Sequence, residues 1–229
     1  LPKSQKDLGL KIRQSNLCSE ITLPTNEERT AVCCLSSVNL EHFDTWSKDP
    51  EFINDLITML DNVLQHYIDN AVDTNQLGER SLGLGAMGFH AYLQSKNIPF
   101  EGIFAVGFNH KAFNYIKKEA TKATKLLAEE RGEAPDVHGK GVRNANLLAV
   151  APNASSSIIC SGTSPSIEPY RANVYTHKTL SGTYQVKNPY LEKLLKSKGL
   201  KATQLNKIWK SISGDEGSVA NVKELTDKE

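Results

Sequence analysis

The sequence of 229 residues, 39% apolar and 23% charged, is typical of a globular protein long enough to bury a core in one domain. Its 27 basic and 26 acidic residues leave a net charge of +1, so bulk charge favours neither nucleic acid nor a membrane surface as a partner. No run of about 18 apolar residues occurs, which argues against a membrane-spanning helix.

The four cysteines, at positions 18, 33, 34 and 160, do not form the pattern of a secreted disulfide framework. Two of them are adjacent, and adjacent cysteines seldom bond to each other because the resulting ring is strained. No CxxC motif and no histidine cluster with zinc-ligand spacing is present, so the sequence predicts no metal site. We therefore expect free thiols in a reducing compartment, and hence a cytoplasmic protein.

The first predicted element is an extended segment over residues 16–23. In an extended backbone Asn16, Cys18 and Glu20 point to one face, which brings an amide, a thiol and a carboxylate together. A thiol beside an ionisable group is a candidate reactive cysteine. The alternative is a short core strand whose cysteine only packs, and the spacing alone does not exclude it.

A strand that runs into a loop is predicted over residues 31–40, and it contains Cys33 and Cys34. Two amphipathic helices are predicted over residues 49–70 and 111–131, because their apolar residues recur at three-and-four spacing. For the helix over residues 49–70 we expect a packing role.

A GxGxxG pattern spans Gly83–Gly88. A dinucleotide-binding interpretation requires a buried strand before this pattern and an acidic residue about 20 positions later at a strand end. Residues 75–80 do not resemble a buried strand, and Glu101 lies in a turn-like stretch. We therefore expect these glycines to let a strand and the helix predicted over residues 89–95 approach closely.

An apolar strand is predicted over Leu147–Val150, and it leads into a turn of small and hydroxyl-bearing residues. The turn contains Pro152, Asn153, Ala154, Ser155 and Ser156. An element is expected to begin near Ser155, and backbone N–H groups with hydroxyls at a helix start bind anions. The alternative is a plain serine cap without a ligand.

The last third of the sequence predicts a hairpin over residues 175–186 and helices over residues 190–198 and 205–212. Thr226 and Glu229 have the spacing of a helix start, and the first residue is not a methionine. We therefore expect a piece of a longer polypeptide.

Four stretches resemble the large (alpha) subunit of ribonucleotide reductase. Residues 15–25 and 31–40 resemble its finger-loop region, residues 80–85 resemble a glycine-rich segment of the family, and residues 151–169 resemble its substrate-phosphate loop. This resemblance implies an α/β fold, part of the family's ten-stranded α/β barrel with a central finger loop. It also implies that residues 1–229 are a single domain, the C-terminal half of an incomplete catalytic barrel without the N-terminal part and the C-terminal tail.

The resemblance assigns roles to individual residues. It implies that Cys18 becomes a thiyl radical, that Asn16 holds a sugar hydroxyl of the substrate, and that Glu20 acts as the base on it. Cys33 falls where the family keeps one half of its redox dithiol, and the extra thiol of Cys34 lies outside the common pattern. Substrate contacts are implied at Asn16, Leu17, Cys18, Ser19, Glu20, Pro152, Asn153, Ala154, Ser155 and Ser156.

The implied activity is that of a ribonucleoside-diphosphate reductase, an oxidoreductase of deoxyribonucleotide biosynthesis and DNA replication. The implied partners are a ribonucleotide substrate, the remainder of the alpha subunit, a radical-generating small subunit and a thioredoxin- or glutaredoxin-type reductant, in an oligomer. No cofactor is expected to bind this chain directly, because the resemblance implies a radical from a diiron-type partner subunit, with adenosylcobalamin as the alternative. Arg171 is a candidate for positive charge near the phosphates.

The sequence departs from the family pattern at its thiols. No cysteine precedes Cys18 to complete the dithiol, and no C-terminal cysteine pair is present to reload it. We therefore expect the isolated chain to be inactive. The alternatives are a non-catalytic fragment or degenerate homologue that binds nucleotide or a partner, and a hydrolase with Cys18 as nucleophile, for which no signature is found.

Overall fold

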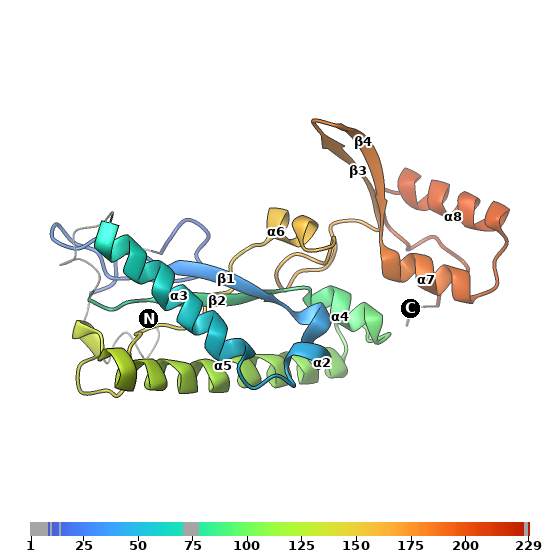
Figure 1. The fold of residues 1–229 in the computed structure, drawn as a ribbon. Coiled ribbons are helices and arrows are strands. Elements are labelled where there is room, and N and C mark those ends of the chain that lie inside the picture. The colour runs from blue at the N-terminus through green and yellow to red at the C-terminus, as the bar shows by residue number, and fades with distance from the viewer. Residues whose placement is uncertain (1–8, 10, 14, 71–77, 227–228) are drawn as a thin grey trace.

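The computed structural model describes residues 9, 11–13, 15–70, 78–226 and 229. These residues form two groups of elements, a parallel sheet covered by long helices and, at one end of the molecule, a hairpin with two helices (Figure 1). None of the helices in the described ranges is both long and apolar enough to cross a membrane. The helix start expected at Thr226 extends into residues 227–228, which lie outside the described residues.

The sheet of the first group consists of parallel strands. β1 (Cys34–Asn39) pairs with β2 (Leu82–Met87) along the whole length of both strands. A third segment, residues 146–149, runs along the other edge of β2 and forms a parallel bridge between Leu84 and Leu148. The predicted strand that contains Cys34 is therefore confirmed, the second predicted strand is reduced to this bridge, and the glycine pattern forms the strand between them.

Long helices cover one face of this sheet. α3 (Phe52–Asn70) and α5 (Ile103–Arg131) pack against each other and against the sheet, as their amphipathic patterns predict. The shared core includes Cys34, Val38, Ile57, Leu60, Leu64, Leu82, Leu84, Ala86, Ile116, Ala120 and Ala123. α5 begins before the predicted Lys111, because the buried Ala105 and Phe108 continue its apolar stripe toward the N-terminus.

Short helices connect the longer elements. After β1 come the 3-10 helix η1 (Leu40–His42) and α2 (Phe43–Trp46), and after β2 comes α4 (Phe89–Ser95), as predicted. The 3-10 helix η3 (Pro135–Val137) follows α5, and α6 (Ala154–Ile159) follows the third segment. Strands thus alternate with helices, and the predicted α/β class is confirmed.

A buried acidic residue joins the helices to the starts of the strands. The Asp61 side chain on α3 is fully buried, and its carboxylate accepts hydrogen bonds from Arg80 (2.9 Å), Arg143 (2.8 Å) and Arg131 (3.2 Å). Asn144 adds a fourth donor at 3.0 Å. Burial alone would raise the pKa of Asp61, but the hydrogen bond from Arg143 and the charge of Arg80 hold the pKa below its usual value. Asp61 therefore stays charged and fixes the starts of β2 and the third segment against α3.

The second group has an apolar core of its own. β3 (Val174–Thr179) pairs antiparallel with β4 (Gly182–Lys187), and α7 (Pro189–Ser197) and α8 (Ala202–Gly214) follow. The core consists of Val174, Leu191, Leu195, Ile208, Trp209, Ile212 and Val222. The predicted hairpin and both predicted helices are confirmed.

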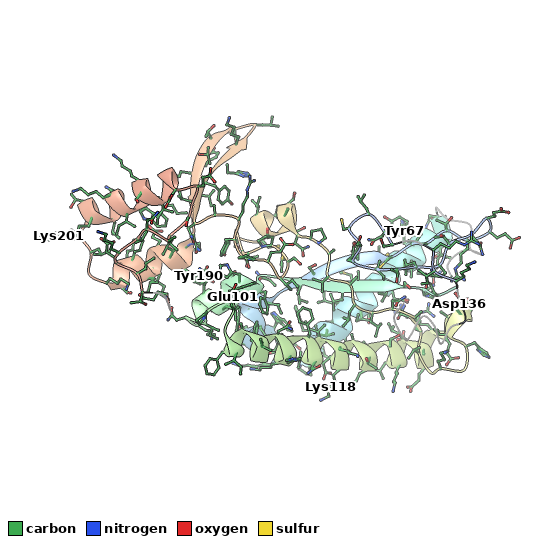
Figure 2. All side chains as sticks on the ribbon, turned by 180° about the vertical axis from the view of Figure 1, so that it is seen from behind. Tyr67, Glu101, Lys118, Asp136, Tyr190 and Lys201 are labelled. Atoms are coloured by element: carbon green, nitrogen blue, oxygen red, sulfur yellow. The ribbon has the colours of Figure 1, made fainter. Side chains whose placement is uncertain are left out.

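Polar contacts join the two groups. Asn188 Nδ2 donates to Gln94 Oε1 at 3.0 Å, and the Tyr190 hydroxyl donates to the Glu41 carboxylate. Figure 2 shows Tyr190 near this junction and Asp136 at the opposite end of the first group. One domain for the whole chain stays a prediction.

Replacing Asp61 by asparagine is expected to destabilise the chain by about 3 kcal/mol or more, because buried arginines lose their counter-charge. The volume of the side chain hardly changes, so packing does not account for the loss. The free energy of unfolding in urea at pH 7 measures the effect. Asp55→Asn, at an exposed position of the same helix, is the matched control and is expected to cost less than about 1 kcal/mol. Equal losses in the two variants would contradict the role of Asp61.

Candidate functional site

The face of the sheet opposite the helices is open. On β1, Cys34 and Val38 point into the helix-covered core, so Leu35 points to the other face. Cys33 faces the same side as Leu35, because a Cβ added to Gly83 of β2 would meet both side chains. Strand alternation thus separates the adjacent thiols: Cys34 is 7% exposed within the core, whereas Cys33 lies on the open face.

The extended geometry predicted for residues 16–20 is wrong, because these residues form a tight turn. Ser19 N donates to the Asn16 carbonyl at 3.1 Å, and Ile21 N donates to Asn16 Oδ1 at 3.3 Å. Ser19 has a left-handed backbone with φ of 59°, which reverses the chain. Strand alternation therefore does not arrange the amide, the thiol and the carboxylate on one face. No helix forms at these positions either.

The turn has an exposed tip and an anchored base. The three tip residues are exposed, namely Leu17, Cys18 and Ser19. Leu17 is 98% exposed, so nothing in the described structure covers the tip. Ile21 and Leu23 are buried against Ala149 of the third segment, and Cys33 packs on the same cluster. The base of the turn is therefore fixed to the open face beside Cys33.

Two carboxylates affect the pKa of the Cys33 thiol. The pKa of Cys33 is raised to about 12, first by burial and then by the charges of Cys34, Glu79 and Glu20. Glu20 turns inward from the turn, and its Oε2 atom is buried without a hydrogen-bond partner among the described residues. Cys33 is therefore a protonated thiol at neutral pH.

Glu79 is a residue of this site that sequence reasoning missed. It is 3% exposed, Ser81 donates a hydrogen bond to it, and Asn146 Nδ2 donates to Ser81 Oγ at 2.8 Å. Burial raises the pKa of Glu79 to about 7, against the lowering effect of Arg29. Its Oε2 atom has no partner in the part of the chain that is described. A glutamate beside Arg80 in a polar stretch gives no sequence signal of burial.

The loop of residues 151–156 is tied to the sheet by an asparagine. With its nitrogen facing acceptors, the Asn153 amide donates to the carbonyls of Ala86 (3.1 Å) and Ala151 (3.0 Å) and accepts from Ser37 Oγ (3.2 Å). Asn153 occupies the N-cap position of α6 but makes no capping hydrogen bond with its side chain, and the helix begins at Ala154, one residue before the expected Ser155. The other predicted residues of the loop are exposed, namely Pro152, Ala154, Ser155 and Ser156.

Two neighbouring pockets open at this face. The first, of about 440 Å³, is lined by Ser15, Asn16, Ile21, Leu23, Thr25, Arg29, Thr30, Ala31, Cys33 and Leu35. The second, of about 460 Å³, is lined by Leu35, Ser36, Ser37, Met87, Ala151, Pro152, Asn153, Ser156 and Cys160. Leu35 lines both pockets, so they adjoin across one side chain.

The structure brings together part of the predicted site. Asn16 shares a pocket with Cys33, and Ser156 of α6 lines the adjoining pocket. α6 lies on the face of the sheet away from α5 (Figure 1). Cys18 and Arg171 are exposed and belong to neither lining. The open face therefore combines a protonated thiol, the buried Glu79, the partly buried Glu20 and a hydroxyl-bearing loop.

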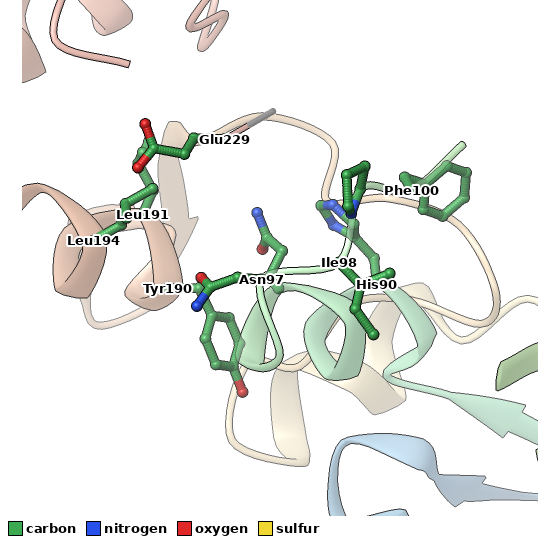
Figure 3. A pocket seen from close by; sticks show the side chains of 10 residues that line it. His90, Asn97, Ile98, Phe100, Tyr190, Leu191, Leu194 and Glu229 are labelled. Atoms are coloured by element: carbon green, nitrogen blue, oxygen red, sulfur yellow. The ribbon is translucent and has the colours of Figure 1, made fainter. Parts of the chain in front are cut away.

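A third cavity, of about 340 Å³, lies between α4 and α7 (Figure 3). It is lined by His90, Gln94, Asn97, Ile98, Pro99, Phe100, Tyr190, Leu191, Leu194 and Glu229, and none of the predicted site residues is among them. Burial lowers the pKa of His90 to about 4, and its Nδ1 accepts a hydrogen bond from Tyr170 N at 3.1 Å. His90 is therefore a neutral residue with a packing role at physiological pH.

Comparisons with known proteins agree on one family. The family described as "Ribonucleotide reductase, barrel domain" matches residues 3–140 and 134–229. The whole chain aligns at 47% identity with the ribonucleoside-diphosphate reductase large subunit of Invertebrate iridescent virus 3, covering 37% of that protein. Over 97% of the chain, the putative large subunit of Frog virus 3 (isolate Goorha) is 50% identical, and 40% of that protein is covered.

A solved structure supports the same relationship. The chain is similar to the Actinobacillus ureae class Id ribonucleotide reductase alpha subunit, with a TM-score of 0.86 and 38% identity. The match covers 99% of this chain and 42% of that one. The chain thus spans about two fifths of the length of these relatives.

Gly85→Ala is expected to destabilise the chain by about 2 kcal/mol or more. A Cβ at Gly85 would meet the Ala149 carbonyl oxygen and, at 3.2 Å, Ser37 Oγ, so the strands would have to separate. Gly107 in α5 is the matched control, because nothing lies within 4 Å of its added Cβ. Gly107→Ala is expected to stabilise by roughly 0.5–1 kcal/mol. Urea unfolding measures both, and a neutral Gly85→Ala would contradict the close approach.

The buried Glu79 predicts a pH dependence of stability. Its pKa is about 7 in the folded chain, against about 4.3 in an unfolded one, so protonation favours folding. This contribution is complete below about pH 4 and is lost as the pH rises through about 7. Relative to the unmodified chain, Glu79→Gln is expected to gain roughly 2 kcal/mol between pH 5 and pH 8. Parallel stability curves of the two chains over this range would disprove the expectation.

Proposed function

Because this chain belongs to the ribonucleotide reductase family and forms part of its α/β barrel, we propose that it is the catalytic part of a ribonucleoside-diphosphate reductase large subunit. One observation carries the proposal beyond family membership. The base of the finger turn, the Cys33 thiol and the hydroxyl-bearing loop open at the same face of the sheet, in two pockets that adjoin at Leu35. In a nucleotide the phosphates are attached to the sugar, so a molecule with its sugar in the first pocket brings its phosphates to the second.

In the proposed reaction, a thiyl radical at Cys18 removes the 3′ hydrogen of a bound ribonucleotide. Glu20 takes the proton of the 3′ hydroxyl, and Asn16 holds that hydroxyl in position. The 2′ hydroxyl leaves as water, a dithiol supplies two electrons and becomes a disulfide, and Cys18 returns the hydrogen. The exposed tip at Leu17 and Cys18 fits this proposal only when a substrate and the rest of the barrel cover it, because a thiyl radical must be kept from water.

Burial favours Cys33 over Cys34 as the thiol of this dithiol. Cys33 lines the pocket at the finger base, whereas Cys34 packs among the core residues of β1 and the helices. A thiol that exchanges disulfides must be reachable by another thiol. The second thiol of the pair is assigned to the remainder of the subunit, since no cysteine precedes Cys18.

For phosphate binding we propose the loop of Pro152, Asn153, Ala154, Ser155 and Ser156. Its exposed hydroxyls and backbone N–H groups are the donors, because the lining of the adjoining pocket contains no Lys or Arg. The Asn153 side chain is already bound to Ser37 and Ala86, so its contribution is to hold the loop. The proposal no longer includes Arg171, which lies outside the lining.

The proposed partners follow from the missing groups. They are the remainder of the alpha subunit, a small subunit that generates the radical, and a thioredoxin- or glutaredoxin-type dithiol, in a cytoplasmic oligomer. A diiron-type centre in the small subunit is the favoured radical source, and adenosylcobalamin is the alternative. The isolated chain is therefore expected to be inactive.

Co-expression of this chain with its genomic neighbours, followed by an assay of deoxyribonucleotide formation, tests the proposal. Activity that requires this chain supports it. Nucleotide binding without reduction in the reconstituted complex would favour the alternative of a non-catalytic nucleotide-binding module.

In the active complex, Cys18→Ser is expected to lower kcat by more than about 10³-fold while nucleotide binding is kept, because serine cannot carry the radical. Cys34→Ala is the matched control, since that thiol packs in the core, lines neither of the two pockets and is not used by the proposed reaction. Substantial deoxyribonucleotide formation by Cys18→Ser would refute the role of Cys18.

A further inference from the structure

Glu79 is a buried acid that the proposed reaction does not use. It is 3% exposed, and its Oε2 atom lacks a hydrogen-bond partner among the described residues. A buried carboxyl oxygen without a partner costs about 1–3 kcal/mol. Such a group in a folded protein calls for an explanation, and a functional one is common.

Glu79 lies two residues before Ser81, the residue that the strand register brings opposite Cys33. β1 and β2 run in parallel with Cys34 opposite Leu82, so Cys33 lies opposite Ser81. The Ser81 hydroxyl donates to Glu79, and a Cβ added to Gly83 would lie 3.0 Å from Cys33 Sγ. The acid and the thiol therefore share the open face of the sheet, and the charge of Glu79 acts on Cys33.

Cys33 needs a proton when it leaves a disulfide. A thiol with a low pKa leaves readily in thiol–disulfide exchange, and a thiol with a high pKa leaves slowly. The Cys33 pKa of about 12 makes its thiolate a poor leaving group. A neighbouring acid that protonates the departing sulfur removes this barrier, and the best such acid has a pKa near the working pH. Glu79, with a pKa of about 7, meets this requirement.

We propose that Glu79 is the proton donor and acceptor of Cys33 in thiol–disulfide exchange. The functional setting rests on the proposed reductase activity, in which Cys33 alternates between thiol and disulfide. When the substrate is reduced, Cys33 and a second thiol lose two electrons and two protons, the S–S bond forms, and the Glu79 carboxylate takes the Cys33 proton. The two electrons, the proton of the second thiol and one proton from solvent pass to the ribonucleotide, whose 2′ oxygen leaves as water.

The return step is balanced in the same way. The thiolate of an external dithiol attacks the partner sulfur of the Cys33 disulfide, a new S–S bond forms, and the old one breaks. The departing Cys33 sulfur takes the proton of the Glu79 carboxyl group. The products are a disulfide of the attacking thiol, a Cys33 thiol and a Glu79 carboxylate.

Other charged and titratable groups also face this pair. Cys34 and Glu20 act on Cys33, while Arg29 and Asp136 act on Glu79 and pair with each other. Arg29 favours the carboxylate and Asp136 favours the acid, so their effects on Glu79 oppose each other. The burial of Glu79 keeps both of its protonation states accessible near neutral pH.

The test uses the whole chain with Cys33 as its single cysteine, through Cys18→Ser, Cys34→Ala and Cys160→Ser. Hydroxyethyl methanethiosulfonate converts Cys33 into a mixed disulfide, and mass spectrometry follows its reduction by dithiothreitol from pH 6 to pH 9. With Glu79 present, the rate per dithiothreitol thiolate is expected to fall as the pH rises through about 7. Glu79→Gln is expected to slow the reduction about tenfold or more at pH 6 and to remove this fall.

Alkylation of Cys33 by iodoacetamide at pH 8 provides a second readout of opposite sign. Glu79→Gln removes a negative charge beside the sulfur, so alkylation is expected to accelerate about threefold, equivalent to about half a pKa unit. Glu79→Asp is expected to restore part of the exchange rate, and the exposed Glu28→Gln is the matched control. Slower exchange together with faster alkylation supports proton transfer.

Unchanged or faster exchange in Glu79→Gln overturns the proposal. Local unfolding would accelerate both reactions and is therefore distinguished from proton transfer. If Glu79→Gln loses its native circular dichroism, the test rests on the chain that keeps Glu79. A reduction rate per dithiothreitol thiolate that does not fall through pH 7 in that chain also overturns the proposal. Neither assay requires ribonucleotide reduction, so failure of the proposed function would be seen separately, in the co-expression assay.

Discussion

One buried carboxylate holds the first group of elements together. Asp61 binds Arg80 just before β2 and Arg143 just before the third segment, and it reaches Arg131 at the end of α5. The ends of the strands are therefore set by charge as well as by apolar packing. Arg80 has a left-handed backbone with φ of 45°. Its side chain therefore reaches Asp61, while the side chain of the neighbouring Glu79 lies toward the opposite face of the sheet. The same short stretch thus supplies both a structural ion pair and a candidate functional acid.

The open face depends on the glycines of β2. Side chains at Gly83 and Gly85 would collide with Leu35, Cys33 and the third segment, so this strand presents backbone where its neighbours present side chains. Because β2 has no side chains at these two positions, three features come close together over it: the finger base, the Cys33 thiol and the loop after the third segment. A glycine pattern that resembles a dinucleotide fingerprint therefore acts here through the close approach of strands, as its sequence context predicts.

Periodicity predicted the helices and the hairpin well, because those elements are set by which residues they bury. It failed at residues 16–20, where Asn16 accepts a backbone N–H group and Ser19 adopts a left-handed conformation. Neither feature has a periodic signature. The start of α5 was also missed, because Phe108 is buried against Phe89 and Tyr92 of α4 and against Phe43 of α2, which lie outside the local pattern.

The sequence predicted only part of the candidate site, because local patterns do not show which distant residues will bury a side chain. The finger and the loop were found through motifs, whereas Asp61 and Glu79 are charged residues whose burial depends on partners distant in the sequence. Asp61 occupies an inward position of an amphipathic helix between Leu60 and Leu64, and that was the available signal. Glu79 had none. The roles of Cys18, Glu20 and the loop serines stay predictions until the reaction is measured.

The outer edge of β1 has a consequence for work with this polypeptide. Among the described residues nothing pairs with that edge, and it borders a pocket of about 370 Å³ lined in part by Met59, Val63 and Tyr67. These side chains are 45%, 41% and 46% exposed. A free strand edge beside apolar side chains recruits other strands, including those of identical molecules. The purified chain will therefore be prone to aggregate as its concentration rises, and a covering polypeptide will determine its solubility.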